Sequence, residues 1–203
     1  MADPLKLVIF IDAQNTYKGA RESFFSGNDP RLYGQIDPVK LGQLIESRGG
    51  PGGLECTLAD VRVYTGRPDS SRDPKTYAAH MKQCATWQAS GVTLIWRSLR
   101  YPKDWPKARA EEKGIDVALA IDYVAMAVDG AYDIGVIMST DTDLVPALEF
   151  TDQRFPHVRY PAVAAWRSPR SNRRLIVRGS NVWCHFLVRA DYDAVADLTD
   201  YNL

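Results

Sequence analysis

The stretch Leu5-Lys-Leu-Val-Ile-Phe-Ile-Asp12 decides the fold, because it is short, almost continuously apolar and rich in β-branched residues. A run of this kind is typical of a strand that is buried on both faces of a parallel sheet. The run ends on a carboxylate, and no helical stripe directly follows Asp12 to suggest that the acid only caps a helix. We therefore expect Asp12 to lie exposed at the edge of the sheet or to bind an ion.

Strand and helix patterns alternate along the rest of the chain. Strands are predicted over residues 58–64, 92–96, 132–138, 158–166 and 182–187, and helices over 36–47, 74–89, 115–128, 144–150 and 192–198. The helix over 115–128 is the clearest, because its apolar residues form one stripe: Val117, Ala120, Ile121, Val124 and Val128. This alternation predicts an α/β fold with a mostly parallel sheet that helices cover on both sides.

The composition fits a globular protein of this size. The 203 residues are 45% hydrophobic and 25% charged, with 14 Gly and 12 Pro, which excludes a disordered, collagen-like or coiled-coil chain. No apolar run approaches the ~20 residues that span a bilayer, and the acidic start at Asp3 is unlike a signal peptide. We expect a single domain over residues 1–203, located in the cytoplasm, with no membrane partner.

Cysteine and histidine chemistry is not indicated. The three Cys and three His are scattered, and Cys184 and His185 are the only neighbours among them. Adjacent side chains on a strand point to opposite faces. The sequence therefore favours a buried thiol and a hydrogen-bonded histidine over a zinc, iron or thiol site.

Charge is unevenly distributed along a chain whose formal net charge is zero. From Gln153 to Ala190 there are eight arginines and no acid, which leaves 17 basic and 25 acidic residues, a charge of −8, for the remainder. Guanidinium groups bind phosphate and aromatic rings stack on bases, so the segment favours a single-stranded nucleic acid. A solvated basic face, or pairing with the protein's own acids, stays open. The arginines expected to contact substrate are Arg167, Arg170, Arg173 and Arg174.

Carboxylates stand where two predicted strands end. Asp12 ends the first strand, Asp141 and Asp143 follow the strand over 132–138, and Asp116 begins the helix over 115–128. Ligands of parallel sheets bind at the carboxyl ends of strands. Acids without accompanying His or Cys favour Mg²⁺ or Mn²⁺, and such ions support phosphodiester chemistry. A phosphatase of the HAD type, and a purely capping role for Asp116 and Asp143, stay open here.

Three motifs resemble one family in order and spacing, the NYN domains of the PIN-like nucleases. The segment Asp12-Ala-Gln-Asn15 is similar to the family's D-x-x-N opening. The helix from Lys113 to Asp122 is similar to its K-G-x-D-x-x-L-x-x-D motif, and residues 139–146 resemble its S-G-D-x-D-F-x-P turn. In that turn Thr140 replaces Gly and Leu144 replaces an aromatic residue.

The resemblance covers about residues 5–166, and an arginine-rich extension follows over about 167–203. Within the family, the sequence is similar to the bacterial LabA-like branch. It implies a Rossmann-like three-layer sandwich in which the first and fourth strands are neighbours. It also implies an endoribonuclease that acts on single-stranded or structured RNA with Mg²⁺ or Mn²⁺, and Lys113 is expected near the substrate. The implied metal ligands are Asp12, Asp116, Asp141 and Asp143, and the implied polar supports are Asn15 and Ser139. A weak or inactive RNA- or protein-binding module on the same fold is the competing interpretation, and a homodimer is a further hypothesis.

Overall fold

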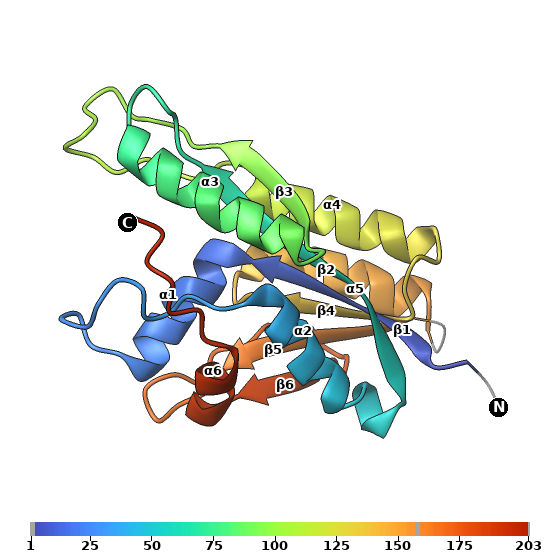
Figure 1. The fold of residues 1–203 in the computed structure, drawn as a ribbon. Coiled ribbons are helices and arrows are strands. Elements are labelled where there is room, and N and C mark those ends of the chain that lie inside the picture. The colour runs from blue at the N-terminus through green and yellow to red at the C-terminus, as the bar shows by residue number, and fades with distance from the viewer. Residues whose placement is uncertain (1–2, 157–158, 203) are drawn as a thin grey trace.

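The computed structural model describes residues 3–156 and 159–202, and a six-stranded, fully parallel sheet forms its centre (Figure 1). The strands are β1 (Leu5–Asp12), β2 (Cys56–Arg67), β3 (Thr93–Ser98), β4 (Ile134–Met138), β5 (Tyr160–Trp166) and β6 (Trp183–Leu187). Their order is β3-β2-β1-β4-β5-β6, so β1 and β4 are neighbours, as the resemblance implied. The predicted α/β fold with a parallel sheet is confirmed.

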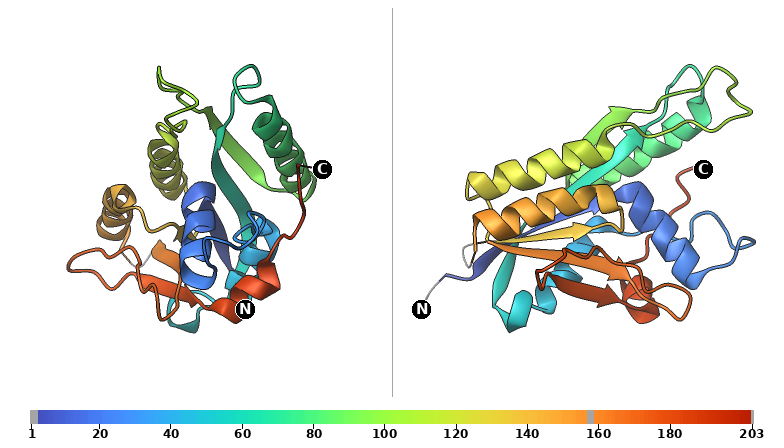
Figure 2. Two further views of the ribbon diagram at one scale, coloured as in Figure 1. Left: turned by 90° about the vertical axis from the view of Figure 1, so that its left-hand side faces the viewer. Right: turned by 180° about the vertical axis from the view of Figure 1, so that it is seen from behind.

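Helices cover both faces of the sheet and make three layers (Figure 2). One face carries α1 (Ala13–Phe24), α2 (Pro38–Ser47), α3 (Pro74–Ala89) and α6 (Arg189–Val195), and the other carries α4 (Ile115–Val128) and α5 (Val145–Arg154). Two short 3₁₀ helices, η1 (Pro51–Gly53) and η2 (Thr142–Leu144), complete the set. Two apolar cores result because β1 alternates, with Ile9 and Ile11 in one core and Val8 and Phe10 in the other.

Helix α1 follows β1 without a connecting loop, so the interpretation that Asp12 does not cap a helix is wrong. The residues that α1 buries are small or polar, namely Thr16, Ala20 and Ser23, and they leave no apolar stripe to recognise. Asp12 is the N-cap of this helix and is 7% exposed. The expectation that Asp12 lies exposed at the sheet edge is therefore also wrong.

Helix α4 packs with a different face from the one predicted. Val117, Ile121 and Val128 of the predicted stripe are 54%, 60% and 58% exposed, whereas Leu119 and Tyr123 are fully buried. The helix is apolar around most of its circumference, so the period alone does not say which face packs on the sheet. Tertiary contacts decide, and the sheet receives the side that carries Tyr123.

The other predicted elements are present, with shifted ends. The strand predicted from residue 132 begins at Ile134, and the helix predicted over 192–198 spans Arg189–Val195. The strand predicted from 158 begins at Tyr160, since Arg159 lies in a bend, and Val158 lies outside the described residues. Both β6 and α6 follow residue 166, and β6 pairs with β5 as a strand of the sheet while α6 packs against it. The division into a core and an extension stays a prediction. No helix of the described chain combines the length and hydropathy needed to cross a bilayer.

His185 in β6 is buried, but among the described residues its Nε2 has no hydrogen-bond partner, so the expectation of a hydrogen-bonded histidine is wrong. It is 4% exposed. Cys184, the preceding residue, packs against the core on the opposite face, as the alternation predicted. Burial, and then the nearby Arg48 guanidinium, lower the pKa of His185 to about 4, so the imidazole is neutral at pH 7.

The substitution His185→Phe should remove part of the protein's sensitivity to acid. The unfolded imidazole takes up a proton near pH 6.5 and the folded one only near pH 4, so the wild type loses stability as the pH falls between these values. At ~1.4 kcal/mol per pKa unit, the full loss is about 3 kcal/mol. Chemical denaturation at neutral and acidic pH measures it. We expect the variant to gain on the wild type at acidic pH, and an unchanged difference would contradict this assignment.

Candidate active site

The strand order reverses between β1 and β4, with β2 and β3 on one side and β5 and β6 on the other. In open α/β sheets, ligands bind in the crevice outside the carboxyl ends of the strands at such a point. Asp12 is the last residue of β1, and the segment from Ser139 to Asp141 follows β4 directly. The first and third sequence motifs therefore meet at the expected place.

Ser139 connects the two acids across the strand ends. Its Oγ donates to Asp12 Oδ2 at 3.2 Å and accepts the Asp141 backbone N–H at 3.1 Å. Asp12 Oδ1 accepts the backbone N–H of Asn15 at 3.0 Å, as an N-cap does. Asp141 Oδ1 accepts the backbone N–H of Asp143 at 3.0 Å. Both carboxylates are thus held by backbone groups and keep further lone pairs for a ligand.

Asn15 fixes the turn after β4 against helix α1. Its Oδ1 accepts the backbone N–H of Thr140 at 2.9 Å and the Thr140 hydroxyl at 3.2 Å. Thr16, the next residue, donates its hydroxyl to the Met138 carbonyl at 3.2 Å. The hydroxyl of Thr140, where the motif has Gly, is therefore turned to Asn15. Asn15 positions the turn that carries Asp141.

The Asp12 carboxylate is electrostatically strained. Burial raises its pKa, the hydrogen bonds from Asn15 and Ser139 lower it, and the neighbouring Asp141 carboxylate raises it again. Together these effects leave the pKa of Asp12 above its usual range. The arrangement resists negative charge and favours a cation close to the two acids.

Glu112 is a site acid that the sequence analysis missed. Its Oε1 accepts the backbone N–H of Gly66, near the end of β2, at 2.7 Å. Burial raises the pKa of Glu112, and the Asp12 and Asp116 carboxylates raise it further. A Cβ atom at position 66 would stand 2.6 Å from Glu112 Oε1, so only glycine admits this carboxylate. Gly66 lies two residues beyond the strand predicted over 58–64, although it is inside the observed β2, so the strand pattern carried no signal of this close approach.

Three predicted site residues make fewer contacts within the site than Asp12 and Asp141 do. Asp116 is half-buried in the first turn of α4 and Asp143 is exposed in η2. Neither carboxylate accepts a side-chain hydrogen bond within the part of the chain that the structure describes. Lys113 is exposed, with its Nζ 3.6 Å from Glu111. Asp116 joins the other acids through its electrostatic interaction with Glu112.

The acids have the oxygen donors that a divalent cation prefers, but the described side chains do not form a ready metal site. Over residues 3–156 and 159–202, no group of three or more His, Cys, Asp or Glu side chains forms a metal site. The available donors are carboxylate and hydroxyl oxygens, which hard cations such as Mg²⁺ and Mn²⁺ prefer. Burial is the main cause of the raised pKa values of Asp12 and Glu112, and neighbouring carboxylates add to it, so a cation close to these acids would be favoured.

Exposed cations border these acids. Lys18 in α1 lowers the pKa of both Asp12 and Glu112. The Arg97 side chain lies beside Gly114, with its Cδ 3.7 Å from where a Cβ would stand. Arg173 lines a small pocket together with the turn after β4. Sequence analysis missed Lys18 and Arg97, which stand near the site only because the fold brings them there.

The other predicted arginines contact the protein itself. Arg167 and Arg174 lie over the Phe186 ring, with 4.7 and 5.5 Å between each guanidinium carbon and the ring centre. Arg170 donates to the Phe25 carbonyl at 3.3 Å. Arg173 is thus the predicted arginine that borders the site.

Comparison with protein families matches residues 6–159 to the NYN domain. Among solved structures, a protein of unknown function from Vibrio parahaemolyticus is similar, with a TM-score of 0.51 and 19% identity. The likeness covers 81% of this chain and 83% of that one, and at this identity it bears on the fold alone. No curated protein gives a significant match. The similarity to the LabA-like branch stays a prediction.

Removing the Ser139 hydroxyl should destabilise the protein. The side chain is 2% exposed, so Ser139→Ala leaves a buried oxygen of Asp12 with one hydrogen bond fewer. We expect the free energy of unfolding to fall by about 1–3 kcal/mol, measured by chemical denaturation. Thr142→Ala, an exposed position on the same turn, is the control and should cost less than about 0.5 kcal/mol. Equal losses would contradict the connecting role of Ser139.

Proposed function

The chain belongs to the NYN domain family, within the PIN-like nuclease superfamily, and from this premise we propose that it is a metal-dependent endoribonuclease. Domains of this family have a nuclease-like fold and are generally ribonucleases that act on RNA. The observation that carries the proposal is the bridge from Asp12 through Ser139 to Asp141, at the point where the strand order reverses. Glu112 belongs to the same group of acids by its interaction with Asp12.

In this proposal Asp12 and Asp141 bind Mg²⁺ or Mn²⁺. The remaining ligands come from Asp116, Asp143 or Glu112, directly or through water. Such an ion, when bound, supplies an activated water and neutralises charge on the phosphate oxygens. The support lies in the donor chemistry, which is all oxygen, and in the raised pKa values of Asp12 and Glu112, which burial causes first and neighbouring carboxylates second.

The chain's own residues orient the acids and hold the substrate. Asn15 and Ser139 position the turn that carries Asp141, through the hydrogen bonds to Thr140 and Asp12. Lys18, Arg97 and Arg173 surround the acids with positive charge, which attracts backbone phosphates without reading the base sequence. We propose single-stranded RNA as the substrate, because its flexible backbone can follow such scattered contacts. The cytoplasmic location and the homodimer stay predictions.

A non-catalytic RNA- or protein-binding module is the second candidate. The observation in its favour is that the described acids do not form a ready metal site. Against it stands the repulsion around Asp12, because negative charge beside RNA phosphates weakens binding unless a cation compensates it. An activity assay separates the two.

Asp12→Asn and Asp141→Asn should each abolish RNA cleavage with the fold intact. Losing a metal ligand removes transition-state stabilisation of several kcal/mol, so we expect a loss of at least about 100-fold. The assay follows labelled single-stranded RNA with Mn²⁺, Mg²⁺ or EDTA. Asp129→Asn, an exposed position at the opposite end of α4, should cleave like the wild type.

Cleavage that survives EDTA, or an Asn variant as active as the wild type, would contradict the metal mechanism. A wild type that binds RNA but does not cleave it with either ion would favour the binding module.

Arg173→Gln should weaken RNA binding by removing a phosphate contact. For single strands, each lost contact flattens the slope of log affinity against log salt by about 0.7. Arg178→Gln, an exposed arginine of the same acid-free segment, should leave the slope unchanged. Affinities at several salt concentrations, alongside melting curves, measure the effect. Equal slopes for the two variants would exclude Arg173 as a specific contact.

A further inference from the structure

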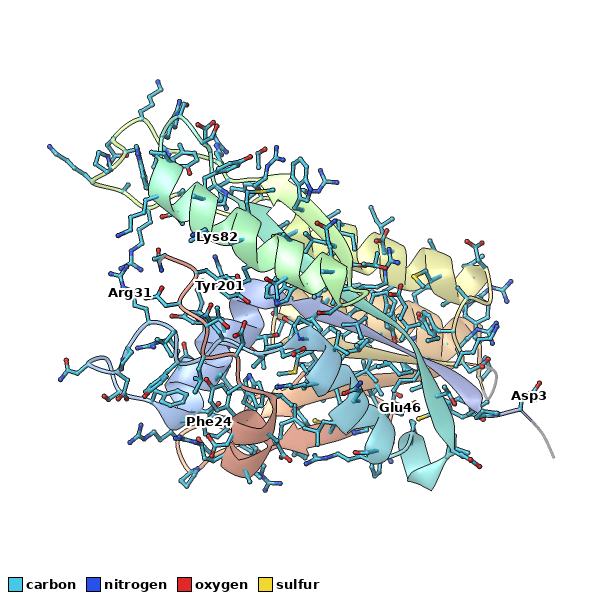
Figure 3. The ribbon with its side chains drawn as sticks, in the orientation of Figure 1. Asp3, Phe24, Arg31, Glu46, Lys82 and Tyr201 are labelled. Atoms are coloured by element: carbon cyan, nitrogen blue, oxygen red, sulfur yellow. The ribbon has the colours of Figure 1, made fainter. Side chains whose placement is uncertain are left out.

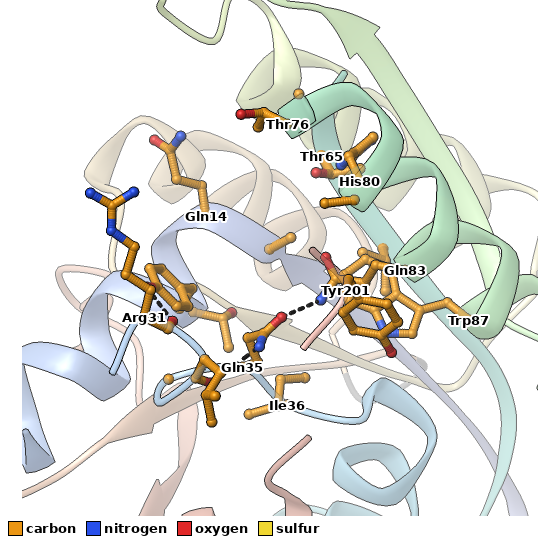
Figure 4. Close-up of a pocket in the computed structure, with 18 of the residues that line it drawn as sticks. Gln14, Arg31, Gln35, Ile36, Thr65, Thr76, His80, Gln83, Trp87 and Tyr201 are labelled. Carbon is orange, nitrogen blue, oxygen red and sulfur yellow. Dashed lines mark hydrogen bonds between the residues drawn. The ribbon is translucent and has the colours of Figure 1, made fainter. Parts of the chain in front are cut away.

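A pocket of about 780 Å³ lies beside the candidate site, between α1 and α3 (Figure 4). Five segments form most of its walls: the start of α1, the loop over residues 30–38, the end of β2, the inner side of α3, and residues 200–202. Ile11, Leu99 and Glu112 complete the lining. Figure 3 places Arg31, Lys82 and Tyr201 on this side of the molecule. The volume falls within the ~300–1,000 Å³ of ligand-binding pockets.

The loop that walls this pocket is held in place from within the protein. The Arg21 guanidinium donates to the carbonyls of Pro30 and Tyr33, at 2.7 and 2.8 Å. Gly34 adopts a positive φ of 107°, and a Cβ there would come within 3.1 Å of the Tyr17 ring. The loop can therefore pack on Tyr17 only because residue 34 is glycine. The pocket exists before any ligand enters.

The pocket and the acids share a border. Ile11 and Ala13, which flank Asp12 in the chain, both line the pocket. Glu112, which interacts electrostatically with Asp12, lines it too. A group bound in the pocket would therefore lie next to a phosphate bound at the acids, since both are at the carboxyl ends of the strands.

The lining combines amide groups with flat rings. Gln83 donates its Nε2 to Gln35 Oε1 at 3.0 Å, and both side chains face the same space as Tyr201 (Figure 4). That bond uses one of the two N–H groups of Gln83 and leaves its carbonyl oxygen open. An amide's neighbouring donor and acceptor match the edge of a nucleobase, and the rings of Tyr17 and Tyr201 offer stacking surfaces.

Trp87 supplies an independent observation. It lines the pocket, is 8% exposed, and its indole N–H has no acceptor among the described residues. Buried donors are normally paired, and an unpaired one costs about 1–3 kcal/mol. Nucleobases carry acceptors of the kind that this N–H lacks, namely carbonyl oxygens and unprotonated ring nitrogens. The indole nitrogen is itself buried, so such an acceptor reaches it only if neighbouring side chains shift.

We propose that this pocket binds one nucleobase of the RNA, beside the phosphate held at the acids. The inference rests on the proposed ribonuclease function and adds to it a preference for the nucleotide at the cleavage position. Phosphate contacts alone give no such preference.

Binding is measured first, without catalysis. The four ribonucleoside 5′-monophosphates and ribose 5-phosphate are titrated into the full chain in Mg²⁺ by calorimetry or NMR. The cation compensates the charge of the acids, and a mononucleotide has no phosphodiester bond to cleave. Ala79→Trp fills the pocket from α3, whereas Ala78→Trp places the same ring at the adjacent exposed position. We expect at least one nucleotide to bind. The indole of Ala79→Trp occupies the space of the base, so affinity should fall by at least about ten-fold in that variant and stay unchanged in Ala78→Trp.

A second pair of variants covers the case in which Ala79→Trp does not fold. Gln83→Leu removes the amide at similar volume, and Gln88→Leu makes the same change at an exposed position of α3. The expected loss of affinity is confined to Gln83→Leu. Ribose 5-phosphate that binds as tightly as the nucleotides, no nucleotide binding at all, or equal binding in the variants and their controls would overturn the proposal.

Cleavage of RNA with each of the four bases at one position then separates the two proposals. Nucleotide binding in the pocket without any RNA cleavage in Mn²⁺ defeats the ribonuclease function and leaves the base pocket standing. Cleavage with identical base preference in the wild type and Gln83→Leu defeats the pocket and leaves the ribonuclease standing.

Discussion

A carboxylate buried at the end of an apolar strand is the constraint on which the candidate site depends. Asp12 lies next to Ile11 inside the sheet, and an isolated charge there would be costly. Three groups make the position tolerable: the Asn15 backbone N–H, the Ser139 hydroxyl, and the start of α1 that Asp12 caps. Each also ties β1 to a neighbouring element, so the acid and the local fold depend on one another.

The same constraint explains why the site spans two strands. Ser139 can reach Asp12 only because β4 pairs with β1, and it then orients the Asp141 backbone. Glu112 approaches from a different direction, over the glycine near the end of β2. The acids therefore come from segments that are far apart in the chain, and the parallel sheet aligns their ends. The pocket opens at that edge, where β2 and α3 continue the wall.

Structural elements that are marked by periodic or continuous runs of large apolar residues could be predicted from the sequence. The strand from Leu5 to Asp12 and the parallel sheet follow from continuous apolar runs that alternate with helices. Helix α1 could not be predicted, because it buries only small or polar side chains against the sheet. The face of α4 that packs on the sheet was also not predictable, because the helix has apolar residues around most of its circumference.

The site residues also divide into those that the sequence could predict and those that it could not. Asp12 ends β1 and Asp141 follows the end of β4, and their proximity follows from strand order, which the family resemblance supplied. Glu112 lies in an irregular segment, and its approach depends on the missing side chain of Gly66, which no periodicity reveals. The arginines were distinguishable only in three dimensions, since Arg167 and Arg174 stack on Phe186 whereas Arg173 borders the turn after β4.

The most direct measurement is a crystal structure of the protein soaked in Mn²⁺, with anomalous diffraction to locate the ion. The account predicts one or more anomalous peaks between Asp12 and Asp141, at the ~2.0–2.4 Å from oxygen ligands that hard divalent cations adopt. Asp116, Asp143 or Glu112 should complete the shell, directly or through water. Absence of any peak at these acids at millimolar Mn²⁺, with Asp12 still hydrogen-bonded to Ser139, would contradict the metal site and with it the ribonuclease mechanism.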